Sequence, residues 1–113
     1  VARLEGARLV DDEAFSRAWV ADRVKLAPRS RRMLLYELAG KGIAPEIAQA
    51  ATEYVQDDET AVALAARKAR SLRSRPKEEV TKKVTAFLVR KGYNHTLSAR
   101  AAQHASETAP EFP

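Results

Sequence analysis

The sequence Asp-Asp-Glu at residues 11–13, followed by Lys-Gly at 41–42, recurs as Asp-Asp-Glu at 57–59, followed by Lys-Gly at 91–92. The acidic triplets lie 46 residues apart (57 minus 11), and the Lys-Gly pairs lie 50 apart (91 minus 41). Self-similarity near this period is typical of tandem helical arrays, in which each unit buries its apolar face against its neighbours. The repeat therefore predicts an extended binding surface rather than a catalytic pocket.

The first copy contains signals for three short helices. Asp11 or Asp12 can cap a helix that runs to about residue 25, with Phe15, Ala18 and Trp19 as its buried stripe. A second helix, over about 29–41, is predicted to end at Lys41-Gly42, because glycine accepts a positive φ without steric cost. Proline at position 45 fits the first turn of a third helix.

The second copy repeats this plan. Asp57 or Asp58 is predicted to cap a helix through about Leu72, Pro76 to open the next, and Asn94 to cap the last. No segment alternates with the period of a strand. The predicted fold is all-α, with tandem three-helix repeats at 10–56 and 57–107. Residues 1–9, in which Gly6 resembles a helix end, are predicted to be a remnant of a preceding repeat with a linker, and 108–113 a frayed tail.

Composition limits the class of protein. With 113 residues, 45% of them hydrophobic and 31% charged, the chain can form a few stacked helical units. No apolar run approaches the ~20 residues that a membrane-spanning helix needs. The sequence contains no cysteine, which excludes disulfides and thiolate metal sites and is consistent with a cytoplasmic location.

Charge is distributed unevenly along the chain. Residues 1–66 carry nine Lys/Arg and eleven Asp/Glu, whereas residues 67–113 carry eleven and four, which gives net charges of −2 and +7. A chain polarised in this way is expected to meet a polyanion, or an acidic protein groove, with its second half.

Two groups of basic residues are candidates for partner or DNA contact. The first and densest group comprises Arg67, Lys68, Arg70, Arg73, Arg75 and Lys77, and is continued by Lys82 and Lys83. The second group is Arg29, Arg31 and Arg32, whose charge opposes the dipole at the start of a helix. Alternatively, the first group covers a solvated helix end, and Asp22, Glu37 or Glu46 neutralises the second within the fold.

Other side chains offer little sign of chemistry. Trp19 and Phe15 are expected in the core, whereas Tyr36 lies off its helix's apolar stripe and is a candidate contact residue. His95 and His104 have no accompanying metal ligands. We predict no catalytic, cofactor-binding or metal-binding residue and no enzymatic activity, because no nucleophile, base and orienting group can be proposed together.

Several of these segments, in their order, resemble the RecX family. They are residues 9–15, Arg23, residues 37–43 and residues 87–93, and the resemblance extends over about 1–105. It implies a non-enzymatic, cofactor-free regulator of the bacterial RecA recombinase, acting in DNA repair, homologous recombination and the SOS response. Such a protein would lie in the groove of the RecA–DNA filament and restrain strand exchange, ATP turnover and coprotease activity. The family usually has three repeats, whereas this sequence shows two and a short preceding stub.

Two other functions are compatible with the same residues. One is a helical module that contacts phosphates of single- or double-stranded DNA directly through the basic second repeat. The other is an interaction module with an unrelated acidic partner. Neither a membrane nor a small-molecule substrate is predicted as a partner.

Overall fold

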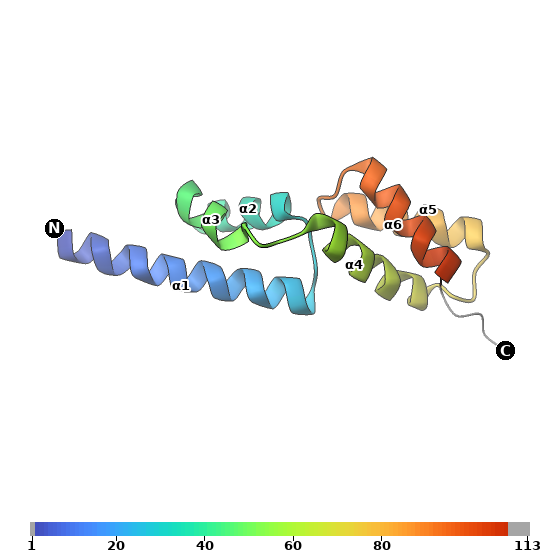
Figure 1. The fold of residues 1–113 in the computed structure, drawn as a ribbon, viewed down its shortest axis with the longest axis horizontal. Helices are drawn as coiled ribbons and strands as arrows, with labels where there is room; N and C mark the ends of the chain where they lie inside the picture. Colours follow the sequence, from blue (N-terminus) through green and yellow to red (C-terminus); the bar gives the residue numbers. More distant parts are fainter. Residues whose placement is uncertain (1, 109–113) are drawn as a thin grey trace.

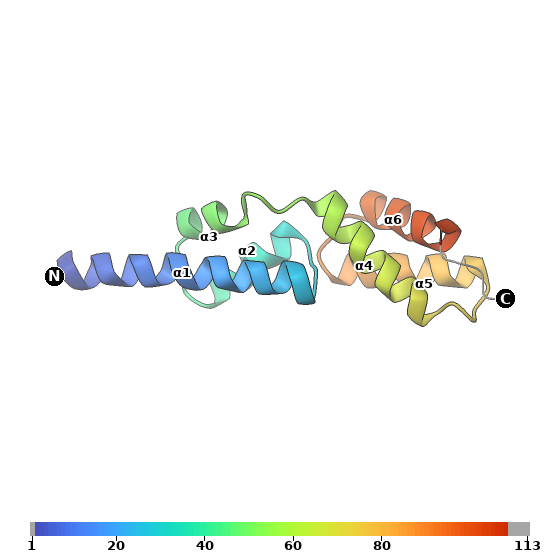
Figure 2. The same cartoon turned by 60° about the horizontal axis from the view of Figure 1, so that its bottom comes forward.

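Six helices make up the described part of the chain, residues 2–108 of a computed structural model, and this part contains no strand (Figure 1). They are α1 (Ala2–Leu26), α2 (Arg31–Gly40), α3 (Pro45–Thr52), α4 (Asp57–Ser71), α5 (Lys77–Arg90) and α6 (His95–Thr108). Two groups of three helices lie end to end, so the molecule is elongated, with extents of 64 × 25 × 18 Å (Figure 2). The predicted all-α array of three-helix units is confirmed.

The first helix is longer than the sequence predicts. α1 continues through Gly6 and Asp11 without interruption, so the predicted helix end at Gly6 and the predicted cap at Asp11 or Asp12 are wrong. A glycine inside a helix costs only about 1 kcal/mol relative to alanine, which the rest of a 25-residue helix can offset. Of the predicted tail, Thr108 ends α6 and residues 109–113 lie outside the described residues.

The buried face of α1 also differs from the prediction. Ser16 and Val20 are fully buried, whereas Phe15 is 43% exposed, Ala18 is exposed and Trp19 is half-buried. The prediction followed the large apolar residues Phe15 and Trp19. The face that packs against α3 lies one position further along the helix, at Ser16 and Val20. The core assignment of Phe15 is therefore wrong, and Trp19 packs only at the edge of the core.

Each three-helix group has its own core. Equivalent positions 50 residues apart are buried in both: Leu34 and Leu38 match Val84 and Leu88. Just after α3, Val55 is buried and Tyr54 exposed, and in the second half of α6, Ala105 is buried and His104 exposed. Residues that the 50-residue spacing pairs therefore occupy equivalent positions in the two cores.

Positive φ angles occur at the two predicted glycine turns. Gly42 has φ 82° and Gly92 has φ 98°, and each follows a lysine that ends its helix. The two turns differ in their surroundings. A Cβ atom on Gly92 would lie 2.2 Å from Ser30 Oγ of the other unit, whereas one on Gly42 would meet nothing within 4 Å.

The two units are joined by hydrogen bonds to helix ends. The Asp57 carboxylate accepts a hydrogen bond of 2.8 Å from the Arg31 backbone N–H at the start of α2. The Ser30 N–H donates to the Lys91 carbonyl at 3.3 Å. Gln56 occupies the cap position of α4 and forms no side-chain cap there, so the prediction that Asp57 or Asp58 caps its own helix is wrong. Asn94 does cap α6, accepting from the Leu97 N–H at 2.8 Å.

Candidate partner-binding surface

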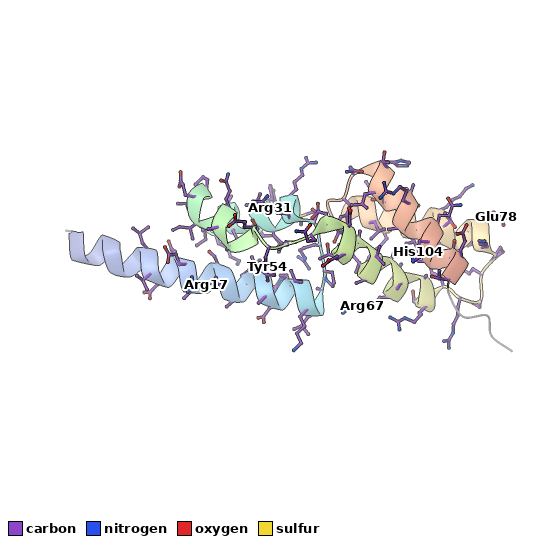
Figure 3. The ribbon with its side chains drawn as sticks, viewed as in Figure 1. Arg17, Arg31, Tyr54, Arg67, Glu78 and His104 are labelled. Atoms are coloured by element: carbon purple, nitrogen blue, oxygen red, sulfur yellow. The ribbon has the colours of Figure 1, made fainter. Side chains whose placement is uncertain are left out.

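Arg67 connects the two units instead of standing free on the surface. Its guanidinium donates to the carbonyl oxygens of Leu26 (2.9 Å) and Lys25 (3.0 Å) at the end of α1 (Figure 3). Carbonyls at a helix C-terminus lack partners inside the helix, and the negative end of the dipole favours a cation. A structural role therefore accounts for this member of the first basic group.

Two members of the second basic group also have partners inside the fold. Arg29 forms an ion pair with Glu37, one of the three acids expected to neutralise this group, and its Nε donates to the Ala27 carbonyl. Arg31 donates from Nε to Thr52 Oγ1 at 3.1 Å and from Nη2 to the Gln49 carbonyl at 3.5 Å. Both side chains fasten α2 to neighbouring segments, which leaves Arg32 as the exposed cation of this group.

Four cations gather around a groove between α4 and α5. We call this the α4–α5 groove; its volume is about 410 Å³ and its lining residues are Lys68, Leu72, Lys82, Lys83, Ala86 and Arg90. None of these residues is acidic. The sequence prediction included the three lysines and missed Arg90, although the spacing of 82, 86 and 90 places these residues on one side of a helix.

The rest of the first basic group lies outside this groove. Arg70 and Arg73 are exposed near the end of α4, and Lys77 is exposed at the start of α5. Arg75 forms an exposed ion pair of 2.7 Å with Glu79. Exposed pairs of this kind contribute little to stability. The structure thus divides one run of cations in the sequence into residues with separate roles.

A second groove lies on the other side of α5. We call it the α5–α6 groove; its volume is about 640 Å³, its surface is mostly apolar, and its lining residues are Thr81, Lys82, Thr85, Ala86, Val89, Arg90, His95 and Ala99. Lys82, Ala86 and Arg90 line both grooves. The exposed side of α5 therefore joins a basic surface to an apolar one.

Tyr36 is 78% exposed, as the sequence predicts. It lines a smaller groove of about 310 Å³ with Arg32, Met33, Val89 and Gly92. Val89, which is 43% exposed, also lines the α5–α6 groove. Tyr36 and Arg32 thus border the same surface of α5, and a contact role for both stays a prediction.

The indole of Trp19 lies among charged groups. The Arg23 guanidinium is 3.8 Å and the Lys41 ammonium 4.3 Å from its ring centroid, and Phe15 stacks at 5.9 Å. Its Nε1–H donates to Glu37 at 3.1 Å. These contacts connect α1 to α2 through a ring that bridges core and solvent.

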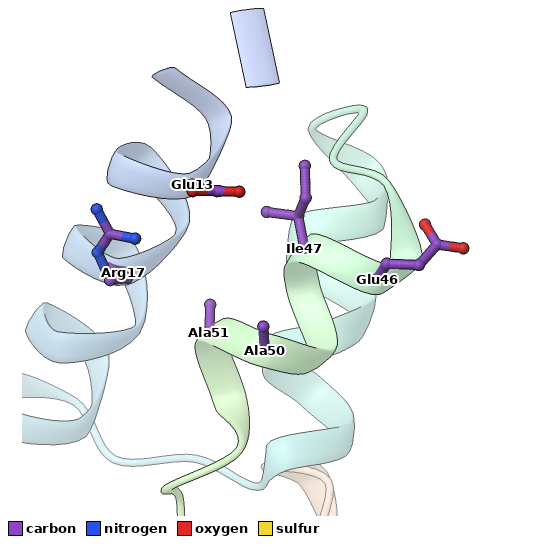
Figure 4. Close-up of a pocket in the computed structure, with 6 residues that line it drawn as sticks. All are labelled: Glu13, Arg17, Glu46, Ile47, Ala50 and Ala51. Atoms are coloured by element: carbon purple, nitrogen blue, oxygen red, sulfur yellow. The ribbon is translucent and has the colours of Figure 1, made fainter. Parts of the chain in front are cut away.

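A further groove between α1 and α3, of about 360 Å³, has mixed character. Glu13 and Arg17 of α1 lie across from Ile47 and Ala51 of α3 (Figure 4). Glu46 also lines this groove, so its charged lining residues are two acids and one cation. It lacks the single sign of charge that the α4–α5 groove has.

Tyr93 is buried in the core of the second three-helix unit. Its hydroxyl donates to Thr60 Oγ1 at 2.6 Å in the core. Burial, which disfavours the phenolate, raises the pKa of Tyr93 to about 12. The group stays neutral at physiological pH and has a structural role.

The part of the chain that the structure describes contains no group of three or more His, Asp or Glu residues placed to hold a metal ion. Both histidines are exposed there. Among the same residues, no helix is both long and apolar enough to cross a membrane.

Comparison with known proteins gives consistent matches. The second three-helix domain of RecX matches residues 11–51, and the third three-helix domain of RecX matches residues 56–101. Relatives named "Regulatory protein RecX" include those of Streptomyces coelicolor (32% identical, covering 98% of this chain), Amycolatopsis mediterranei (34%, 87%) and Chlorobium limicola (29%, 92%). The matches span 61%, 58% and 65% of those relatives' own lengths. No solved structure gives a significant match. The two domain matches fall on the two three-helix units, and the chain belongs to the RecX family of regulatory proteins.

Proposed function

We propose that this chain binds the RecA–DNA filament and restrains the recombinase, ATPase and coprotease activities of RecA, with no catalysis of its own. The observation that carries the proposal is the α4–α5 groove, where Lys68, Lys82, Lys83 and Arg90 converge with no acid among the lining residues. Membership of a family of regulatory proteins supports it. The proposed function implies a cytoplasmic location, where bacterial DNA lies.

Charge and shape both fit a polyanionic partner. Cations that line a groove with no acid among the lining residues attract phosphates or acidic side chains and release counterions on binding, so affinity falls as salt rises. A body 64 Å long can lie along an extended groove and contact more than one subunit of a polymer. Both properties suit a nucleoprotein filament.

The test is inhibition of DNA-dependent ATP hydrolysis by RecA. A variant with Lys68, Lys82, Lys83 and Arg90 all changed to Gln loses four charges from the groove. A matched control changes the exposed residues Arg17, Lys25, Lys41 and Arg100 to Gln, with the same loss of net charge. We expect the groove variant to inhibit at least about tenfold less strongly than the wild type, and the control to stay close to it. Equal inhibition by wild type and groove variant would refute the assignment of this surface.

Direct binding to naked DNA is the second candidate, favoured by the local density of Lys and Arg. Helices that read base edges usually bring Asn, Gln or Arg to one exposed face. The α4–α5 groove offers Lys and Arg but neither Asn nor Gln. This composition suits phosphates or acidic side chains and gives no means of recognising a base sequence. Equal affinity for naked DNA and RecA-coated DNA would favour direct DNA binding.

A further inference from the structure

We infer that the α5–α6 groove binds an extended acidic protein segment through one apolar side chain, so that part of the second unit recognises protein rather than DNA. The inference rests on the proposed function and specifies the chemistry of the partner at that same surface.

The floor of the groove is suited to an apolar side chain. Ala86, Val89 and Ala99 supply hydrocarbon. Thr81 and Thr85 line it too, but their hydroxyls donate to backbone carbonyls one turn earlier, at 3.0 and 2.7 Å. Because those hydroxyls are engaged, these threonines offer methyl groups rather than free donors. A volume of about 640 Å³ is ample for a leucine or phenylalanine side chain.

The rim of the groove is suited to acidic side chains. In the part of the chain that the structure describes, neither Lys82 nor Arg90 forms an ion pair, and both line the α4–α5 groove as well. An acidic group above the α5–α6 groove would therefore gain a partner without displacing one. Lys68 and Lys83 extend the positive surface toward α4.

The spacing of these cations gives a length for the ligand. Lys82 and Arg90 are eight residues apart, which is about 12 Å along a helix. An extended chain covers that distance in about four residues. The expected motif has an acidic residue, a spacer, an apolar residue, a second spacer and another acidic residue.

DNA matches this surface less well than a protein segment does. Phosphates would satisfy Lys82 and Arg90 but would leave the apolar floor of the groove exposed. Apolar grooves with a charged rim are typical of sites where a partner inserts an anchor side chain. No Phe, Tyr or Trp lines the groove, so His95 is the one ring among its lining residues on which an unpaired base could stack.

The test uses two short fluorescein-labelled peptides, one with Glu-Ser-Leu-Ser-Glu at its centre and the other with Leu replaced by Ser. Anisotropy titrations of the wild type should show about tenfold tighter binding of the leucine peptide. Ala99→Phe fills the groove without changing charge and should abolish this preference. Ala63→Phe adds the same side chain at an exposed position of α4 outside the groove and should retain it.

Val89→Ser, which replaces another apolar residue of the groove, provides a second variant with the same expected loss of preference. Circular dichroism verifies that each variant is folded. Equal binding of both peptides to the wild type would overturn the inference. An equal loss of duplex DNA binding and peptide binding in Ala99→Phe would overturn it as well, since DNA would then use the groove. Wild-type inhibition of RecA, measured in parallel, separates the two claims. If the wild type inhibits RecA without preferring the leucine peptide, only the present inference fails; if it does not inhibit, the proposed function fails.

Discussion

Arg67 of α4 donates a hydrogen bond of 2.9 Å to the carbonyl of Leu26 at the end of α1, 41 residues earlier in the chain. A second bond, to the Lys25 carbonyl, uses the other terminal nitrogen of the same guanidinium. From the sequence alone, Arg67 is a candidate for phosphate contact. In the fold it joins the two three-helix units.

Replacing Arg67 tests this joint. Arg67→Lys keeps the charge but loses the planar fork that reaches both carbonyls, and we expect a loss of about 1 kcal/mol in unfolding free energy. Lys68→Arg, at the adjacent position, is the charge-matched control and should be neutral. Urea denaturation followed by circular dichroism measures both. An Arg67→Lys protein as stable as the wild type would show that the two hydrogen bonds contribute nothing.

The two glycine turns form a matched pair for a second test. Gly42→Ala has open space and meets only the cost of a positive φ, about 1–2 kcal/mol. Gly92→Ala meets that cost and also places its Cβ 2.2 Å from Ser30 Oγ, so Ser30 or the turn must move. We expect the Gly92 variant to be the less stable of the two by about 1 kcal/mol or more, as measured by urea denaturation. Equal losses would mean that the contact between Gly92 and Ser30 is loose.

Asp57 provides a third test, because its carboxylate caps α2 from the other unit. Asp57→Ala removes the acceptor for the Arg31 N–H and should cost about 1 kcal/mol of unfolding free energy. Asp58→Ala, one position later in the same first turn of α4, controls for the loss of a charge near the dipole. We expect a larger loss at Asp57 than at Asp58 in the same denaturation assay, and equal losses would show that the hydrogen bond to the Arg31 N–H contributes nothing.

Tyr93 predicts a loss of stability at high pH. Its pKa in the fold is raised by burial to about 12, above the ordinary tyrosine value of 10.0. A raised pKa means that the native state holds the proton more tightly, so this contribution is complete below pH 10 and lost between pH 10 and 12. Ultraviolet titration should show a tyrosine ionising at about pH 12. Tyr93→Phe should remove this step, and a wild-type titration without a step near pH 12 would contradict the assignment.

The sequence predicted the repeat architecture well because local rules govern it. Leu34, Leu38 and their equivalents are buried, and both Lys-Gly turns have positive φ, since spacing and backbone sterics act over a few residues. The prediction of the buried stripe of α1 was wrong because the sequence shows which residues are apolar but not which face of α1 another helix covers.

The candidate site was less predictable for a related reason. Arg67 and Arg31 find their partners 41 and 21 residues away, at helix ends whose position depends on the assembled fold. Charge density alone could not separate them from Lys68 and Lys82, which border the groove. Arg90 follows Lys82 by eight residues, a spacing that puts both on one side of a helix and is visible in the sequence.

Recognition of the filament is tested by a binding titration on RecA-coated single-stranded DNA and on the same DNA without RecA, at several salt concentrations. We expect tighter binding to the coated DNA at every salt concentration. We also expect this preference to be reduced in the variant with Lys68, Lys82, Lys83 and Arg90 changed to Gln, and retained in the control with Arg17, Lys25, Lys41 and Arg100 changed. Equal affinity for coated and naked DNA, or an unchanged preference in the groove variant, would contradict recognition of the filament through the α4–α5 groove.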